Sequence, residues 1–245
     1  MMQRFSQFFK DKRVLVTGGA GFIGSHIVET LVSFGAKVIV IDDLSFGNLE
    51  NLAEVDGKYE FIKGSISQKN VFEEIPKMDI IFNEAALSLF HSFKDPIRDL
   101  AVNTGGMINI LELARRFNSK VIQASTGSVY GNPIKIPVSE NHPLNPISPY
   151  GCSKLAAEIY CDMYHRIYGL DVCCLRYFNV YGPRQRIGEE TGVIPIFVSR
   201  ALNDQPFTIY GDGTQTRDFL HVKDVVRANL LAAISDSMKG QSEYR

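Results

Sequence analysis

The chain of 245 residues is poor in cysteine and has no apolar run long enough to span a bilayer. Its four cysteines lack the spacing of a zinc site or of a disulfide framework. We therefore expect small buried thiols, no metal site and a reducing compartment, with the cytoplasm as the default location. Residues 1–12 lack the apolar stretch of a signal peptide. We interpret them as a short leader, with a helix packed on the domain as one form it can take.

An excess of charge of one sign is also absent, because 26 basic and 27 acidic residues leave a net charge of −1. The basic residues are scattered and form no block. Nothing therefore points to a nucleic acid or an anionic membrane surface as a partner. Scattered cations suit the binding of one small anion better than that of a polyanion.

What is present is a regular alternation of two patterns. Short apolar runs predict strands at residues 13–17, 37–42, 59–63, 80–83, 120–125 and 172–177. Between them, apolar residues at helical spacing predict helices at residues 22–34, 68–74, 97–117 and 150–168. Gly35 and Gly169 are placed as helix C-caps, and Ser148 with Pro149 as a helix start. Such alternation predicts a doubly wound parallel sheet with helices on both faces, an α/β fold.

The pattern loosens after about residue 178. Residues 181–192 are rich in glycine, proline and charge, which predicts a long loop. A helix at 194–203, a strand-like piece at 207–210 and a helix at 222–234 follow, before a polar tail. Within the loop, the two arginines of Arg184-Gln-Arg186 predict either a contact with an additional carboxylate group of the substrate or, as we prefer, a solvated surface loop.

The turn between the first strand and the first long helix carries the pattern Gly18-x-x-Gly21-x-x-Gly24. Glycines at these places let the backbone turn tightly and approach a pyrophosphate at the helix N-terminus. The second strand ends in Asp42, where a carboxylate can bind the adenosine ribose and repel a 2′-phosphate. Asp43 is an alternative, and either acid can instead be a plain loop or cap residue. The context predicts a Rossmann-type dinucleotide site that favours NAD over NADP.

A second group of residues is suited to proton transfer. Tyr150 and Lys154 are four apart, so they share one face of a helix. A nearby ammonium lowers the pKa of a phenol, which can then take a proton from an alcohol and return it. Thr126, or Ser125, follows a buried strand and is placed to hydrogen-bond the reacting oxygen. The alternatives are a cation beside an aromatic ring on a helix surface and ordinary turn chemistry for the hydroxyls.

Five segments together resemble the extended short-chain dehydrogenase/reductases, and most of all the NAD-dependent nucleotide-sugar epimerases of the UDP-glucose 4-epimerase type. They are Thr-Gly-Gly-Ala-Gly-Phe-Ile-Gly (17–24), Ser-Thr-Gly-Ser-Val-Tyr-Gly (125–131), Tyr-Gly-Cys-Ser-Lys (150–154), Arg-Tyr-Phe-Asn-Val-Tyr-Gly-Pro (176–183) and Tyr-Gly-Asp-Gly-Thr-Gln-Thr-Arg-Asp-Phe (210–219). The resemblance covers residues 13–233, in order and at family-like spacing. It implies an NAD-binding Rossmann domain over residues 1–180 and a small, truncated substrate domain over residues 181–245.

The resemblance also implies residue roles. Tyr150 is the acid/base, Lys154 holds the nicotinamide ribose and lowers the Tyr150 pKa, and Thr126 is the catalytic hydroxyl. The implied cofactor contacts are Gly18, Gly21, Phe22, Ile23, Gly24, Asp42, Ser65, Ile66, Ala85, Ala86, Asn103, Tyr150, Lys154 and Tyr177. The implied substrate contacts are Ser125, Thr126, Asn179, Val193, Tyr210 and Arg217, with Arg217 on the diphosphate of a UDP-sugar.

The implied reaction is NAD-dependent 4-epimerisation of a UDP-hexose, in its glucose/galactose, N-acetyl or uronic acid form, through transient oxidation at C4. Gly127-Ser128 replaces the acidic pair of the related dehydratases, and the glutamate of the related decarboxylases is missing, so both activities are disfavoured. The alternatives are a net oxidoreductase on a sugar nucleotide and a non-catalytic NAD-binding protein. Relatives imply a homodimer formed by helices 97–117 and 150–168.

Two positions depart from the family pattern. Ser65 stands where relatives have an aspartate that contacts adenine. Glu84 stands where they have an apolar or small residue, and a carboxylate there is costly unless it is paired. The sequence offers no account of Glu84.

Overall fold

The computed structural model describes residues 2–188 and 191–235. Its centre is a parallel sheet in the order β3-β2-β1-β4-β5-β6, which is the Rossmann order. All six predicted strands are confirmed, and the fifth is one residue longer than expected. Their bounds are β1 Arg13–Thr17, β2 Lys37–Asp42, β3 Tyr59–Lys63, β4 Ile80–Asn83, β5 Lys120–Thr126 and β6 Val172–Tyr177.

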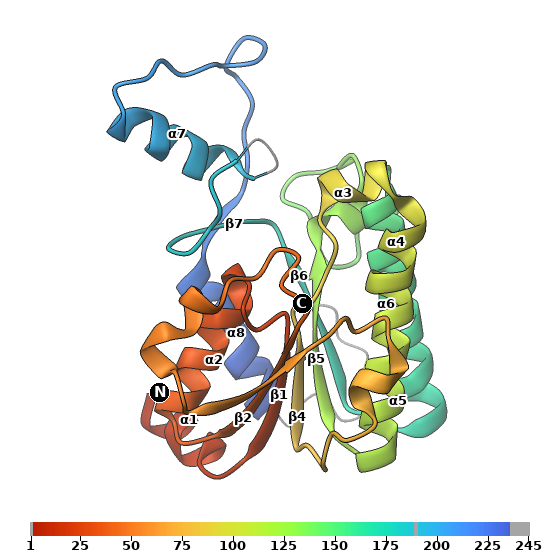
Figure 1. The fold of residues 1–245 in the computed structure, drawn as a ribbon. Helices are drawn as coiled ribbons and strands as arrows, with labels where there is room; N and C mark the ends of the chain where they lie inside the picture. The colour runs from red at the N-terminus through yellow and green to blue at the C-terminus, as the bar shows by residue number, and fades with distance from the viewer. Residues whose placement is uncertain (1, 189–190, 236–245) are drawn as a thin grey trace.

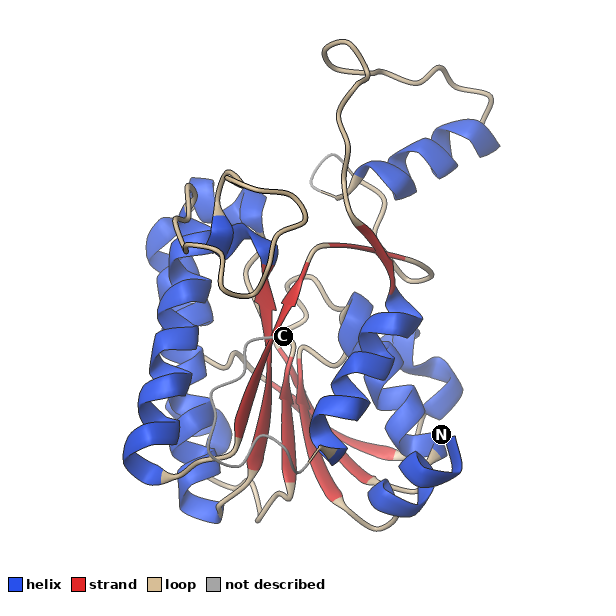
Figure 2. Ribbon diagram, turned by 180° about the vertical axis from the view of Figure 1, so that it is seen from behind, coloured by secondary structure: helices blue, strands red, loops and turns tan. Residues whose placement is uncertain are grey.

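Helices cover both faces of this sheet (Figures 1 and 2). One face carries α1 (Met2–Phe9), α2 (Phe22–Ser33) and α8 (Val222–Ile234), and the leader is indeed a helix, with Phe5 and Phe9 buried. The other face carries α5 (Gly106–Phe117) and α6 (Pro149–Tyr168). Short 3-10 turns are η1 (Leu49–Val55), η2 (Lys69–Phe72) and η4 (Gly127–Tyr130), with η2 in place of the helix expected at 68–74. Within the described residues no helix is long and apolar enough to cross a membrane.

The helix expected at 97–117 is in fact three consecutive pieces. They are α4 (Pro96–Leu100), the π-helical turn η3 (Ala101–Gly105) and α5, preceded by the short α3 (Leu89–Lys94). The expected helix ends are confirmed. The Ser148 hydroxyl accepts a hydrogen bond from the Gly151 N–H, and Gly35 and Gly169 follow their helices with φ of 77° and 67°.

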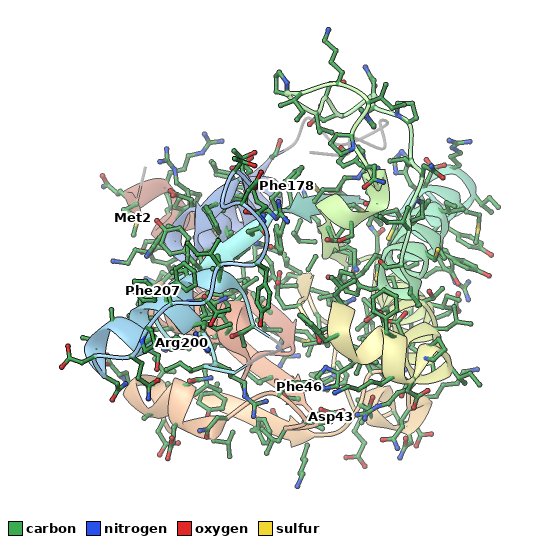
Figure 3. All side chains as sticks on the ribbon, turned by 90° about the horizontal axis from the view of Figure 1, so that it is seen from above. Met2, Asp43, Phe46, Phe178, Arg200 and Phe207 are labelled. Carbon is green, nitrogen blue, oxygen red and sulfur yellow. The ribbon has the colours of Figure 1, made fainter. Side chains whose placement is uncertain are left out.

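The C-terminal segment leaves the sheet and returns to it (Figure 1). The short strands β7 (Asn179–Tyr181) and β8 (Phe219–His221) pair in parallel, and α7 (Val193–Leu202) lies between them in the chain. The strand expected at 207–210 is wrong, because this segment packs on α7 instead of pairing. Phe207 stacks on Phe197 at 4.8 Å between ring centres, and the Arg200 guanidinium donates to Thr208 (Figure 3).

Residues 179–188 and 191–221, which include β7, α7 and β8, form what we call the projecting segment. Helix α8, which follows it, packs against α2 on one face of the sheet. The chain beyond residue 180 therefore contributes to both the projecting segment and the Rossmann layer. The division at residue 180 stays a prediction. Residues 236–245 of the expected substrate domain lie outside the described residues.

Candidate active site

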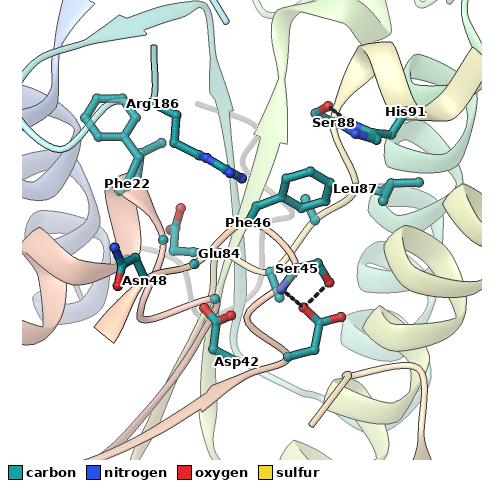
Figure 4. Close-up of a pocket in the computed structure, with 18 of the residues that line it drawn as sticks. Phe22, Asp42, Ser45, Phe46, Asn48, Glu84, Leu87, Ser88, His91 and Arg186 are labelled. Atoms are coloured by element: carbon teal, nitrogen blue, oxygen red, sulfur yellow. Dashed lines mark hydrogen bonds between the residues drawn. The ribbon is translucent and has the colours of Figure 1, made fainter. Parts of the chain in front are cut away.

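A cleft of about 1190 Å³ opens at the carboxyl ends of β1 and β4. The order of the strands reverses between these two neighbours, and Rossmann sheets bind ligands at such a point. The glycine turn, the loop after β2 and the segment after β4 line the cleft, and residues from the 182–192 loop line it as well (Figure 4). The sequence therefore places its candidate cofactor residues at the expected edge of the sheet.

The glycine turn leaves no room for side chains. Gly18 has φ of 65°, and a Cβ there would lie 2.7 Å from the Ala85 nitrogen. A Cβ on Gly24 would lie 2.2 Å from the Gly18 carbonyl oxygen, so any other residue in this first turn of α2 would require a shift of the backbone. Gly21 is the N-cap and provides no side chain to the first turn of α2. Gly21, Phe22, Ile23 and Gly24 all line the cleft, so helix N–H groups without intrahelical partners are available to a phosphate.

We expect Gly24→Ala to weaken ADP-ribose binding about tenfold and to cost about 1–3 kcal/mol of folding free energy, because the added methyl meets backbone. Titration calorimetry and urea unfolding measure the two effects. Gly105→Ala is the control, since a Cβ there has its nearest neighbour at 3.9 Å. Equal behaviour of the two variants would contradict the close packing of the turn.

Asp42 lines the cleft, and its carboxylate ties the glycine turn to the loop after β2. Its Oδ2 accepts a hydrogen bond from the Ala20 N–H at 3.0 Å, and its Oδ1 accepts one from the Leu44 N–H at 2.8 Å. Burial raises the pKa of this carboxyl group. Asp43 also lines the cleft, but it accepts from Ser45 and lies 4.0 Å from the Arg98 guanidinium. The two acids thus have separate partners. The glycine turn, the start of helix α2 and Asp42 together form a site that fits a dinucleotide.

The remaining cofactor candidates fall into two groups. Ser65, Ile66, Ala85 and Ala86 line the cleft. Asn103, Lys154 and Tyr177 are absent from the cleft lining in the described part of the chain. The side chain of Asn103 instead joins three segments: it accepts from the Leu87 N–H at 2.8 Å and donates to Asp99 at 2.7 Å and to Ser153 at 3.1 Å. This places Asn103 as an anchor between the β4–α3 segment, α4 and α6.

Tyr150, at the start of α6, lines the cleft. Thr126, at the end of β5, and Lys154, one turn further along α6, lie close to Tyr150. Burial raises the pKa of Tyr150 to about 12, while a hydrogen bond with Thr126 opposes the rise. The rise is opposite to the lowering that the sequence predicts from Lys154, and the role of Lys154 stays a prediction. The ammonium lies 5.9 Å from the centre of the Tyr150 ring and donates instead to the Ala124 carbonyl at 2.9 Å. Burial lowers the pKa of Lys154 itself to about 8.

Ser125 faces away from this group. Its hydroxyl donates to the carboxylate of Glu158, which also forms a buried ion pair with Arg176 at 2.6 Å. Thr126 caps η4, its Oγ1 accepting from the Ser128 N–H at 3.1 Å. The carboxyl end of β5 therefore sends one hydroxyl into the protein interior and the next toward Tyr150.

The expected substrate residues do not line the cleft in the described chain. Asn179 begins β7 and donates to the Asp218 carbonyl at 2.9 Å, and Val193 begins α7. Tyr210 is 83% exposed, and Arg217 donates to the neighbouring Thr216 carbonyl at 2.7 Å. These last four expected substrate residues all belong to the projecting segment, and none of them is among the residues that line the cofactor cleft.

Sequence reasoning missed a group that borders the cleft from three separate segments. The Phe46 ring contacts the His91 ring edge-on at 4.4 Å, and the Arg186 guanidinium lies 5.9 Å from the centre of the Phe46 ring (Figure 4). Arg184 pairs with Glu29 of α2 at 2.6 Å. Arg186 is exposed, in line with the interpretation of this loop as a solvated surface, whereas Arg184 is partly buried in its pair with Glu29. No local pattern could have found the group, since its members are far apart in sequence. No cluster of metal-ligating residues occurs in the described ranges.

Comparison with known proteins agrees with this geometry. The model of the NAD dependent epimerase/dehydratase family matches residues 14–244. A putative UDP-glucose 4-epimerase of Methanocaldococcus jannaschii is 46% identical over 224 residues, which are 89% of this chain and 72% of that protein. A Thermotoga maritima UDP-glucose 4-epimerase solved with UDP-glucose is 43% identical with a TM-score of 0.87, covering 91% of this chain and 73% of that one.

A third relative, the UDP-glucose 4-epimerase of Thermus thermophilus in complex with NAD, is 41% identical. Its TM-score is 0.83, and the match covers 91% of this chain and 75% of that one. The expected family and the expected fold are thus both confirmed. With the glycine turn, Asp42 and Tyr150 gathered at one cleft and nearly the whole chain matched, this protein belongs to the NAD-dependent epimerase/dehydratase family.

Proposed function

We propose that this protein is an NAD-dependent isomerase that interconverts UDP-hexoses at C4, in the glucose/galactose, N-acetyl or uronic acid series. The observation that carries the proposal is the position of Tyr150, which lines the same cleft as the glycine turn and Asp42. A proton acceptor and a dinucleotide site are thus in one cavity. The names of the relatives, UDP-glucose 4-epimerases at 41–46% identity, support this choice of reaction.

NAD supplies the hydride acceptor and donor when it is bound. The phenolate form of Tyr150 takes the proton of the 4-hydroxyl group, which makes it a phenol, and later returns that proton. Burial raises the pKa of this phenol to about 12, so the positive charge of Lys154 and of the oxidised cofactor has to favour the phenolate. Thr126, which opposes the rise in the Tyr150 pKa, orients the phenol, and Lys154 would hold the nicotinamide ribose. The Rossmann domain over residues 1–180 binds the cofactor, and the substrate domain over residues 181–245, together with Asn179, binds the sugar nucleotide.

The remaining site roles belong to the same proposal. Asn103 and Tyr177 contribute to the cofactor site by positioning its walls. Asn179, Val193, Tyr210 and Arg217 bind the UDP moiety once the projecting segment lies over the cleft. The guanidinium of Arg217 is suited to the diphosphate.

We also propose a homodimer that pairs α4, α5 and α6 with their counterparts. Four apolar side chains on this face are exposed in the single chain: Ile97 by 81%, Leu100 by 55%, Ile159 by 60% and Ile167 by 65%. Large exposed apolar patches of this kind mark protein interfaces. The location of the protein in the cytoplasm stays a prediction.

The test is incubation of the purified protein with UDP-galactose and no added nicotinamide cofactor. We expect UDP-glucose to form with no net change in NADH absorbance, because the hydride returns within each turnover. NADH formation in step with substrate consumption would favour a net oxidoreductase instead. Lack of conversion of UDP-galactose, UDP-N-acetylgalactosamine and UDP-glucuronate alike would contradict the epimerase proposal.

A further inference from the structure

Glu84 is a carboxylate in the cofactor cleft that the mechanism above does not use. It follows β4 directly, is only partly exposed, and lines the cleft together with Ala85 and Ala86. In Figure 4 its carboxylate lies between Phe22 and the loop that carries Phe46. Burial of a carboxylate is unfavourable unless something compensates for it, so an acid at this place calls for a reason.

A chain of hydrogen bonds holds this carboxylate from behind. The Tyr177 hydroxyl of β6 donates to Glu84 Oε1 at 3.0 Å, and Asn229 Nδ2 of α8 donates to the Tyr177 oxygen at 2.6 Å. The same Nδ2 donates to the Val225 carbonyl at 2.9 Å, and Asn229 is fully buried. Because a tyrosine has a single O–H and the amide nitrogen can only donate, the direction of the chain is fixed. Its last acceptor is Glu84.

No ion pair neutralises this carboxylate among the described residues. The charged and titratable groups that act on it are Lys154 and Tyr150 of α6 and Tyr177 of β6. The other charged and titratable groups that line the same cleft are Asp42, Asp43, His91, Arg98, Arg184 and Arg186. Burial raises the pKa of Glu84 to about 7, and the Tyr177 hydrogen bond and the Lys154 charge oppose the rise. Lys154 uses its ammonium on the Ala124 carbonyl, so it acts on Glu84 only through space.

Three carboxylates, Glu84, Asp99 and Glu158, act on the buried ammonium of Lys154, and Glu158 is already paired with Arg176. Glu84 has no ion-pair partner of its own within the described residues. A ligand that brings a positive charge near Glu84 is attracted by this carboxylate, whereas a neutral ligand of the same shape is not.

We propose that Glu84 is a positioning residue whose negative charge favours the oxidised, positively charged nicotinamide over the reduced, neutral one. This rests on the proposed function, in which NAD is reduced and reoxidised within each turnover. A unit charge about 10 Å from another, at an effective dielectric constant of about 20, changes an equilibrium about tenfold. For a two-electron couple that factor corresponds to about 30 mV. The bias favours return of the hydride to the 4-keto sugar and keeps the reduced form from accumulating.

The test compares the Kd values of NAD⁺ and NADH, by titration calorimetry on protein stripped of bound nucleotide and without any sugar. Glu84→Gln removes the charge but keeps an oxygen that accepts from Tyr177. We expect the Kd ratio of NAD⁺ to NADH to rise about tenfold in this variant. In the unaltered protein the preference for NAD⁺ should grow as the pH rises through about 7, because Glu84 is neutral below that value and charged above it. In Glu84→Gln the step near pH 7 should be lost, while a step near pH 8, where Lys154 loses its charge, should stay.

Two control variants separate charge from packing. Glu84→Asp keeps the charge and should keep most of the preference. Glu112→Gln is the matched control, because Glu112 also accepts from a tyrosine hydroxyl, Tyr164 at 2.5 Å, but lies outside the cleft. An unchanged Kd ratio in a Glu84→Gln protein that binds both cofactors would overturn this inference alone. Failure of the unaltered protein to bind either cofactor would overturn both it and the proposed function.

Discussion

Replacement of Tyr150 by phenylalanine should lower the turnover of UDP-galactose about 10²- to 10⁴-fold, because it removes the one hydroxyl that takes the C4 proton. The ring stays, so the wall of the cleft keeps its shape, and NAD binding should change little. A coupled assay for UDP-glucose measures turnover, and titration calorimetry measures cofactor binding. The combination of lost turnover with retained binding is what distinguishes an acid/base from a residue that shapes the site.

Tyr168→Phe is the control for this experiment, because Tyr168 lies on the same helix and is 51% exposed. It should retain full turnover. If Tyr150→Phe also retained turnover within a factor of about two, Tyr150 could not be the acid/base, since even weak acid–base catalysis contributes about 10²-fold.

The largest expected effect on stability is at Glu158, behind the active site. Its carboxylate pairs with Arg176 at 2.6 Å and accepts from Ser125, and the side chains of the pair are 1% and 3% exposed. Glu158→Leu leaves the guanidinium without its carboxylate in a buried place. We expect a loss of about 3–5 kcal/mol in the free energy of unfolding. Urea denaturation followed by circular dichroism measures it.

Two further variants test the cause of that loss. Glu158→Leu combined with Arg176→Met should recover a good part of the lost stability, because no charge then stays buried without its partner. Asp162→Asn breaks an exposed ion pair to Arg166 on the same helix, and it should cost about 0–1 kcal/mol. If Glu158→Leu lowered the free energy of unfolding no more than Asp162→Asn does, the buried pair would contribute little to stability.

This stability prediction bears on function, because Ser125 and Thr126 are neighbours at the end of β5. The Glu158–Arg176 pair holds Ser125 in the interior, and the strand then directs Thr126 to Tyr150. Sequence inspection grouped the two hydroxyls as substrate contacts. The structure separates them, because successive side chains of a strand point to opposite faces.

Local sequence patterns were sufficient to predict those features that depend on a single helix, strand or turn. The strands, the caps at Ser148 and Gly169 and the glycine turn were all predictable, since each depends on residues a few positions apart. The prediction of a strand at 207–210 was wrong, because a strand also depends on residues that are distant in the sequence. An apolar run forms a strand only when another strand pairs with it, whereas Phe207 stacks on the Phe197 ring of α7.

By itself the sequence determined the Rossmann layers, the position of the cleft and the presence of Asp42 and Tyr150 at its edge. Only the tertiary structure decided which charges share that cleft. Arg186 comes to it from the 182–192 loop, and Glu84 is held there by Tyr177 and, through it, by Asn229 of α8. The physical reason is that backbone periodicity is set by near neighbours, whereas the pKa and the partner of a buried group depend on whatever the fold packs against it.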